Sequence, residues 1–236
     1  MNKTTEGIKA LTFDTGGTVL DWHAGISSAF AQAGQRRGLE ADWAAITNEY
    51  RRRSLRNIVG QVQPAFNFDD VHRKVLDEVI AEFKLDVLTA EDRRAIWQTW
   101  HALDAWPDFS PALARLRKRY VVASFTLLTT SLVIDVSRKN SMVWDAILSC
   151  ELWGIYKTRP EAYQRAARLL QLEPAQILMV ACHNFDLNAA MASGYKTAFV
   201  KRPAEWGAEG LPDPVPNPAH TIVVDTFAEL AEHLGA

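Results

Sequence analysis

The chain has 236 residues, of which 48% are hydrophobic, so it can enclose a sizeable core as one large domain or as a core with a modest insertion. A formal net charge of −2, with acidic and basic residues interspersed, argues against a nucleic-acid or membrane-surface partner. Cys150 and Cys182 are too few for a disulfide framework, and no segment reaches the ~18 apolar residues of a membrane span, so a cytoplasmic protein is expected.

The first predicted strand, residues 8–13, ends in an unusual turn. The segment FDTGGTVLDW (13–22) places Asp14 directly after the apolar strand, and Gly16, Gly17 and Thr18 follow as a tight turn. The glycines permit a sharp bend and a close approach of substrate to the backbone. A carboxylate in this position has few structural roles, so we expect Asp14 to act chemically.

Residues from about 25 to 104 have helical spacing of their apolar side chains, as in Val71-Val75-Val79-Phe83 and Ile96-Trp100-Leu103. From about 108 onward, short apolar segments alternate with helical ones. The predicted strands are 120–125, 146–148, 176–181, 197–200 and 221–224, and the predicted helices include 161–170 and 187–193. This order is typical of an α/β fold with a parallel sheet covered by helices on both faces. Residues 1–20 and 105–236 are expected to form this core, with 21–104 as an all-helical insertion.

Four predicted strand ends carry residues with chemical potential: Asp14, Thr126, Lys157 and Asp186. Ligands of open parallel sheets bind beyond the carboxyl ends of the strands, so these side chains are expected to converge. Asp14 can serve as a nucleophile that forms an ester, which water then hydrolyses. Lys157 would keep the carboxylate ionised, Thr126 and Thr18 can donate hydrogen bonds, and Asp186 can position Lys157 or help activate the water.

These segments resemble the motifs of the haloacid dehalogenase superfamily over nearly the whole chain. FDTGGTVLD resembles the first motif, Thr126 the second, YKTRPEAY (156–163) the third and ACHNFDLNAA (181–190) the fourth. The resemblance implies a Rossmann-like core, a helical cap at 21–104 and Asp14 as the nucleophile.

Departures from the motifs favour one branch of that superfamily. Its Mg²⁺-dependent phosphatases have a second Asp where this chain has Gly16, and a metal-binding Asp where it has Cys182. A hard cation prefers oxygen ligands, so phosphoryl transfer is poorly supported. The chain better resembles the metal-independent L-2-haloacid dehalogenases. That branch implies a short 2-halo acid and water as substrates, no metal, no cofactor, and a homodimer.

The resemblance also suggests which residues hold the substrate. Arg51 lies in NEYRRRSL (48–55), which resembles the aromatic–Arg motif of that branch, and KRPAEWG (201–207) resembles the loop that closes the site. The substrate-binding residues expected from these matches are Thr18, Arg51, Tyr163, His183 and Asn184. Three of them have a plainer interpretation: a solvated helix face for the run of arginines that contains Arg51, core packing for Tyr163 and a structural role for His183.

Leu127 stands where that branch normally has a halide-binding Asn, so one hydrogen-bond donor is missing, and Gly16 replaces an aromatic residue, which predicts a roomier site. Two alternatives therefore stay open beside the dehalogenase: a phosphatase-like hydrolase of the same fold, and a degenerate member that binds without turnover.

Overall fold

A six-stranded parallel sheet forms the centre of the computed structural model, which describes residues 5–236. The strand order is β3-β2-β1-β4-β5-β6. The strands are β1 (Ala10–Phe13), β2 (Val121–Thr126), β3 (Ala146–Ser149), β4 (Ile177–Ala181), β5 (Lys196–Val200) and β6 (Ile222–Val224). The predicted α/β class with a parallel sheet is confirmed, and every predicted strand is present with small shifts at its ends.

The central strand β1 is fully buried, because it pairs with β2 on one side and β4 on the other. Its last residue, Phe13, lies opposite Ser124 of β2 and Val180 of β4. The amide of Asp14 then donates to the carbonyl of Val180 at 2.9 Å. This register brings the carboxyl ends of the three strands to one edge of the sheet, where the predicted chemical residues begin.

Helices cover both faces of the sheet, and those of the core are α5 (Phe109–Leu116), α6 (Thr130–Lys139), α7 (Pro160–Leu170), α8 (Asn184–Ala192) and α9 (Phe227–His233). The ring of Phe13 packs against Phe109 of α5 and Phe227 of α9, with centroids 5.6 and 6.1 Å apart. Because Ser124 pairs with Phe13, the next residue, Phe125, points to the opposite face, where it packs against Tyr163 of α7 at 5.4 Å.

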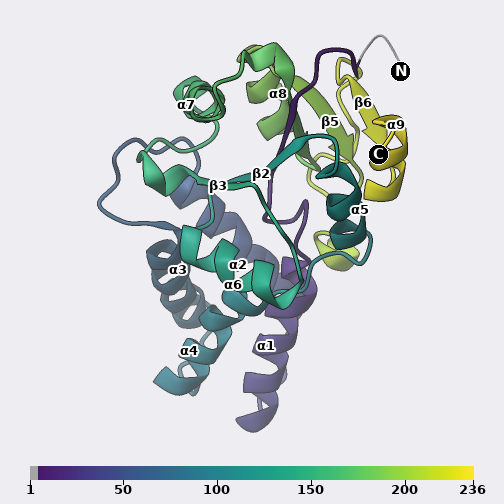
Figure 1. Cartoon of the computed structure of the whole chain (residues 1–236). Coiled ribbons are helices and arrows are strands. Elements are labelled where there is room, and N and C mark those ends of the chain that lie inside the picture. Colours follow the sequence, from purple (N-terminus) through teal and green to yellow (C-terminus); the bar gives the residue numbers. More distant parts are fainter. Residues whose placement is uncertain (1–4) are drawn as a thin grey trace.

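Along the chain, a helical segment lies between β1 and the other five strands. In space, this segment lies at one end of the molecule (Figure 1). It comprises α1 (Trp22–Arg36), α2 (Trp43–Ile58), α3 (Phe68–Glu82), α4 (Ala90–Gln98) and the 3₁₀ helix η2 (Thr99–Ala102). Asp21, Asp42, Asn67 and Thr89 each accept a hydrogen bond from a first-turn amide, which explains where the four α-helices begin. None of the helices in residues 5–236 has the length and apolar character needed to cross a membrane.

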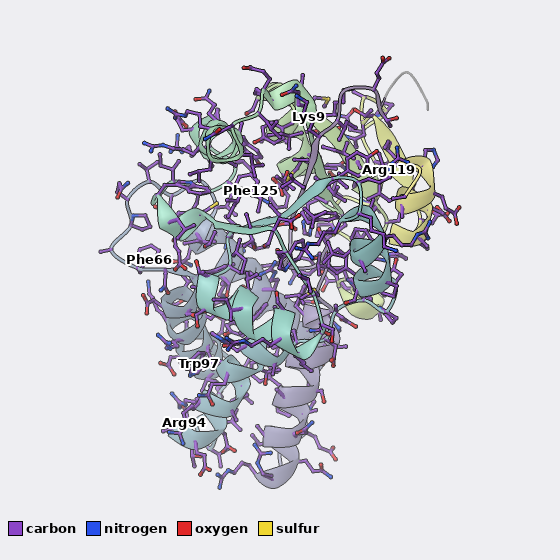
Figure 2. The ribbon with its side chains drawn as sticks, viewed as in Figure 1. Lys9, Phe66, Arg94, Trp97, Arg119 and Phe125 are labelled. Carbon is purple, nitrogen blue, oxygen red and sulfur yellow. The ribbon has the colours of Figure 1, made fainter. Side chains whose placement is uncertain are left out.

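Figure 2 shows two side chains of this helical segment, Arg94 and Trp97. Arg94 and Trp97 lie on α4, far from Phe125 of the sheet. Trp97 is half-buried and carries the guanidinium of Arg73 4.2 Å from its ring centre. This tryptophan therefore packs within the helical segment.

Candidate active site

Asp14 and Lys157 form the centre of a buried charge cluster at the carboxyl edge of the sheet. The Lys157 Nζ atom lies 3.2 Å from Asp14 Oδ1 and 2.7 Å from Asp186 Oδ2, and its side chain is only 1% exposed. Burial opposes the charge on Lys157, but the carboxylates of Asp186 and Asp14 hold its pKa above the ordinary value. Lys157 is therefore a permanent cation between two acids.

The second oxygen of Asp14 has its own donors. Thr18 Oγ1 donates to Asp14 Oδ2 at 2.8 Å, and His183 Nδ1 lies 3.1 Å from the same oxygen. Burial alone would raise the pKa of Asp14, but Lys157, His183 and Thr18 hold it below its usual range. The carboxylate is thus ionised at neutral pH, as a nucleophile requires.

Glu205 completes the cluster and was missed by the sequence analysis. Its Oε1 atom lies 2.9 Å from His183 Nε2 and accepts a hydrogen bond from Trp22 Nε1 at 3.0 Å. Burial would raise the pKa of Glu205, but His183 and Trp22 lower it overall. The imidazole of His183 is also affected by its neighbours. Burial disfavours its positive charge, but Cys182, Glu205 and Asp14 hold the His183 pKa well above its ordinary value. His183 therefore bridges two carboxylates as an imidazolium.

Arg51 reaches this site from α2 of the helical segment. It is 3% exposed, and its Nη2 atom lies 3.3 Å from the carbonyl oxygen of Gly16. The rings of Trp22 and Trp100 flank its guanidinium, each centroid 5.4 Å from Cζ. Its Nε and Nη1 atoms are buried and have no hydrogen-bond partner among residues 5–236. The interpretation of the arginine run as a solvated face therefore fails for Arg51.

The absence of a side chain at Gly16 does not leave open space. A Cβ atom there would lie 3.0 Å from Arg51 Nη2 and 3.8 Å from Leu128 Cδ1. The expected extra room is instead filled by the arginine and the leucine, so this part of the site is compact rather than roomy.

The remaining predicted residues divide into two groups. Tyr163 donates to Asp186 Oδ1 at 2.6 Å, and Thr126 Oγ1 accepts from the amide of Leu128 at 3.1 Å, so both support the strand ends. Asn184 instead holds the loop that follows β5: its Nδ2 donates to Asp213 Oδ2 and to the carbonyl of Val215, each at 2.8 Å. The structure thus gathers Thr18, Lys157 and His183 directly on Asp14, whereas the Asn184 side chain makes its hydrogen bonds elsewhere.

Cys182, His183 and Glu205 place three possible metal-ligand atoms within 4.8 Å of one another. Burial, with the charge of Glu205, raises the pKa of the Cys182 thiol to about 11, so it is protonated at neutral pH. The His183 Nε2 atom already bonds Glu205. Binding a cation there would require the loss of both protons, so hydrogen bonding is the better interpretation of this cluster.

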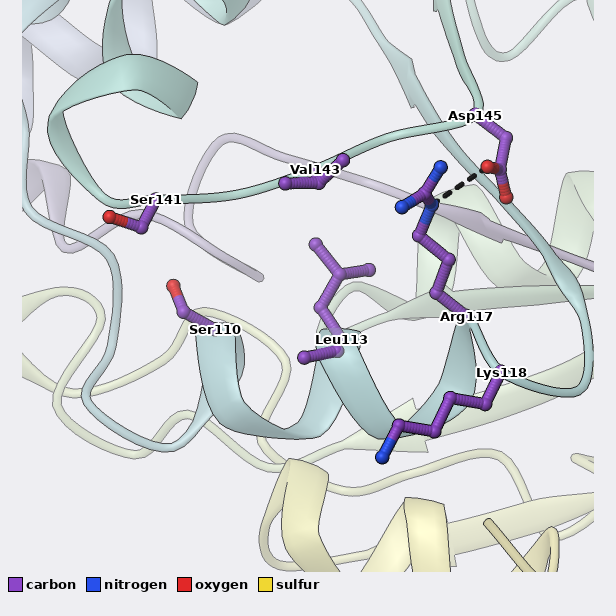
Figure 3. Close-up of a pocket in the computed structure, with 8 residues that line it drawn as sticks. Ser110, Leu113, Arg117, Lys118, Ser141, Val143 and Asp145 are labelled. Atoms are coloured by element: carbon purple, nitrogen blue, oxygen red, sulfur yellow. Dashed lines mark hydrogen bonds and ion pairs between the residues drawn. The ribbon is translucent and has the colours of Figure 1, made fainter.

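Two cavities of similar size lie at opposite ends of the strands. One, of about 310 Å³, is lined by His183 and Glu205 together with Trp206 and residues of α2 and of the loop after β5. The other, of about 380 Å³, lies beside α5, where Arg117 donates to Asp145 at 2.8 Å (Figure 3). Arg117 and Asp145 precede β2 and β3, so this second cavity lies at the amino end of the strands, opposite the edge where ligands of such sheets bind.

Comparison with known proteins shows which family the chain resembles. A family model described as haloacid dehalogenase-like hydrolase matches residues 8–181. The chain is 25% identical over 209 residues to an (S)-2-haloacid dehalogenase 4A of Burkholderia cepacia, covering 84% of each protein. Among solved structures, it is similar to a defluorinating L-2-haloacid dehalogenase (33% identity, TM-score 0.89, covering 97% of this chain and 96% of the other). Another L-2-haloacid dehalogenase structure is 30% identical with a TM-score of 0.89, covering 97% and 99% of the two chains.

Proposed function

The chain belongs to the haloacid dehalogenase-like hydrolase family, and on that premise we propose that it hydrolyses the carbon–halogen bond of short 2-haloalkanoic acids without a metal ion. The observation that carries the proposal is the state of Asp14. Its carboxylate is held ionised by Lys157, Thr18 and His183 at the carboxyl edge of the sheet, and the unpartnered donors of Arg51 are buried close by. A nucleophile beside free cationic donors suits the displacement of an anionic leaving group from an acid.

In the proposed first step, a carboxylate oxygen of Asp14 attacks C2 of the substrate and the halide departs with the bonding electrons. An alkyl halide needs no proton on its leaving group, so the absence of a general acid at Gly16 is compatible with this chemistry. The step forms an ester between Asp14 and the acid. Water then attacks the ester carbonyl, regenerates the Asp14 carboxylate and leaves a 2-hydroxy acid.

Arg51 is the proposed anchor for the two negative charges of the reaction. Its Nε and Nη1 atoms are buried without partners in the described part of the chain, and such donors are costly unless a ligand satisfies them. The substrate carboxylate and the departing halide are the anions available to them. In this role Arg51 compensates for Leu127, whose side chain cannot donate to a halide. We infer from its position on α2 that the segment 21–104 acts as a cap that completes the site.

A Mg²⁺-dependent phosphatase is the weaker candidate, because the residues around Asp14 do not fit that ion. Mg²⁺ prefers oxygen ligands in octahedral geometry, whereas Asp14 is paired with Lys157 and an imidazolium, and the thiol of Cys182, which contacts that imidazolium, is protonated. Asp186 offers no free oxygen to such an ion, since Lys157 holds one and Tyr163 the other. Repulsion from these cations disfavours a divalent ion.

Halide release tests this function. With excess EDTA present, the protein is incubated separately with (S)-2-chloropropionate, its (R) enantiomer and fluoroacetate, and free halide is measured. We expect release from one or more of these acids that survives EDTA and is abolished in Asp14→Asn. Release that requires added Mg²⁺, or that persists in Asp14→Asn, would contradict the proposal.

A further inference from the structure

His72 of α3 is a buried polar side chain that the fold itself does not use. It is 0% exposed, and neither Nδ1 nor Nε2 of its ring has a hydrogen-bond partner among residues 5–236. A buried polar atom without a partner lowers stability, and most such atoms in proteins are paired. The ring nitrogens of His72 are therefore available to a bound molecule.

Neighbouring side chains fix the position of this ring. It stacks between Phe68, with ring centroids 4.3 Å apart, and Trp100, at 4.0 Å. The Trp100 ring donates from Nε1 to the Tyr50 hydroxyl at 3.2 Å, and Tyr50 donates to the carbonyl oxygen of His72 at 2.8 Å. Both faces of the imidazole are thus covered, so only its edge, which carries the two nitrogens, can meet a ligand.

The guanidinium of Arg51 lies beside the same stack. Its Cζ atom is 5.9 Å from the ring centre of Phe68 and 5.4 Å from that of Trp100, and these two rings enclose the imidazole. A group almost equally distant from the two outer rings lies close to the plane of the middle one. The free Nε and Nη1 donors of Arg51 and the free edge of His72 therefore belong to one buried region.

Both groups in this region favour a negative charge. Burial lowers the pKa of His72 well below its ordinary value, and the positive charge of Arg51 acts in the same direction, so the imidazole is neutral. A neutral imidazole keeps one N–H group, which can donate to an anion without adding a second charge beside Arg51. The edges of the surrounding aromatic rings are also slightly positive. A small anion would satisfy donors of both residues at once.

We propose that Arg51 and His72 together form a pocket for one small anion, in which Arg51 supplies the charge and His72 a directed hydrogen bond. The inference rests on the proposed dehalogenase function and deepens it by adding a residue of α3 to the substrate site. The substrate carboxylate and the released halide share the chemistry that this pocket binds. Titrating the two classes of anion separately distinguishes them.

Stability separates this role from a structural one. His72→Phe keeps an aromatic ring in the stack but removes both unpaired nitrogens, so the urea concentration at the midpoint of unfolding should rise. His220→Phe is the matched control, because the ring nitrogens of His220 lie 3.1 Å from Thr197 Oγ1 and 3.0 Å from Asn184 Oδ1. This control variant loses two satisfied hydrogen bonds, and its midpoint should fall. A midpoint that falls in His72→Phe as well would overturn the proposal.

Anion binding is measured by titration calorimetry in chloride-free buffer. Sodium bromide is one probe, and sodium propionate, which has no halogen to lose, is the other. We expect at least one of them to bind the unmodified protein as one anion per chain, with an affinity that falls by about 10-fold or more in His72→Phe. A loss for bromide alone assigns the pocket to the halide, a loss for propionate alone assigns it to the substrate carboxylate, and a loss for both assigns it to both. Unchanged affinities in His72→Phe, or no binding of either anion by the unmodified protein, would overturn the proposal.

Turnover provides a second comparison. For an acid that supports halide release, kcat/KM should fall by about 10-fold or more in His72→Phe, and by less in His72→Asn, whose amide can still donate. Because binding is measured without turnover, the pocket and the proposed function can fail separately. If the anions bind as expected but no 2-halo acid releases halide, the function fails and the pocket stands. If halide is released and His72→Phe changes neither anion binding nor kcat/KM, the pocket fails and the function stands.

Discussion

Gly17 and Glu205 lie so close together that a Cβ atom on Gly17 would be 2.0 Å from Oε1 of Glu205. The glycine of the first turn and the carboxylate of a loop near the other end of the chain therefore share one space. Gly17 also has a φ of +96°, a conformation that favours glycine. Both facts explain why the turn after Asp14 needs a residue without a side chain.

Gly17→Ala should lower the rate of turnover by more than its effect on folding predicts. The methyl group must displace Glu205 from His183, whereas the strain at positive φ costs about 1–3 kcal/mol of folding stability. Gly7→Ala is the matched control, because Gly7 has a φ of +83° and a Cβ atom added there would meet nothing within 4 Å. Halide-release rates and urea unfolding of the two variants provide the comparison. Equal losses of activity in both variants would show that the contact with Glu205 is unimportant.

Arg51→Lys should reduce kcat/KM for a 2-halo acid by about 100-fold to 1,000-fold, the range seen when one donor to a developing anion is removed. Lysine cannot reproduce the planar set of donors that Arg51 directs into the site. Arg53→Lys is a suitable control, because Arg53 lies on the same helix but pairs with Glu49 of α2 and Glu82 of α3. Steady-state kinetics of both variants test this. A similar kcat/KM for Arg51→Lys and the unmodified protein would exclude Arg51 from substrate binding.

Lys157→Met should abolish activity and lower the free energy of unfolding by about 3–5 kcal/mol, because it leaves Asp14 and Asp186 buried without their shared cation. Adding Asp186→Asn to this variant removes one of the two uncompensated charges. The double variant should recover part of the stability, measured by urea unfolding, but no halide release. Recovery of activity in the double variant would mean that Lys157 serves only to neutralise Asp186.

The sequence was sufficient to place the strand ends, because their order and the parallel connections bring Asp14, Lys157 and Asp186 to one edge whatever the details of packing. It was ambiguous for Arg51, since three consecutive arginines point in three directions from a helix. The structure resolves this: Arg52 and Arg53 pair with acids nearer the surface, while Arg51 points inward.

The loop that contains Glu205 was expected to close the site, from the resemblance of residues 201–207, but Glu205 itself was not identified. The loop has no periodic pattern, and the partner His183 is 22 residues away along the chain. The sequence feature related to Glu205 is Gly17, because the absence of a side chain there leaves the space that Glu205 occupies. The sequence does not show which residue fills that space.

Asn184 lines the cavity beside His183 and Glu205, and its place in a motif predicts substrate binding, which stays a prediction. Its hydrogen bonds to the loop that contains Asp213 and Val215 could not be foreseen from the motif.

The contact between the helical segment and the core should weaken as pH rises. His101 of η2 lies 3.3 Å from Asp69 of α3 and 2.8 Å from Asp135 of the core helix α6. The nearby carboxylates of Asp69 and Asp135 raise the His101 pKa above its ordinary value of 6.5, whereas burial opposes this change. The stabilisation from these ion pairs is therefore complete below that ordinary pKa and is lost as pH rises through the higher pKa of the folded state.

Urea unfolding of the unmodified protein and of His101→Gln at about pH 6 and about pH 9 tests this sign. The difference in free energy of unfolding between the two proteins should be larger at the lower pH. His233→Asn, at an exposed position of α9, serves as the control. A difference that grows with pH would contradict the assignment of charged His101 to this contact.

The most direct test of the central claim follows the oxygen of water through a single turnover. Enzyme in excess over a 2-halo acid substrate is allowed to react once in H₂¹⁸O, and peptide mass spectrometry then locates the label. If Asp14 is the nucleophile and water attacks its ester carbonyl, the ¹⁸O is found in the Asp14 carboxylate and the first 2-hydroxy acid formed carries oxygen from the protein. Label in the product and none on Asp14 would mean that water displaces the halide directly, and the covalent mechanism would be wrong.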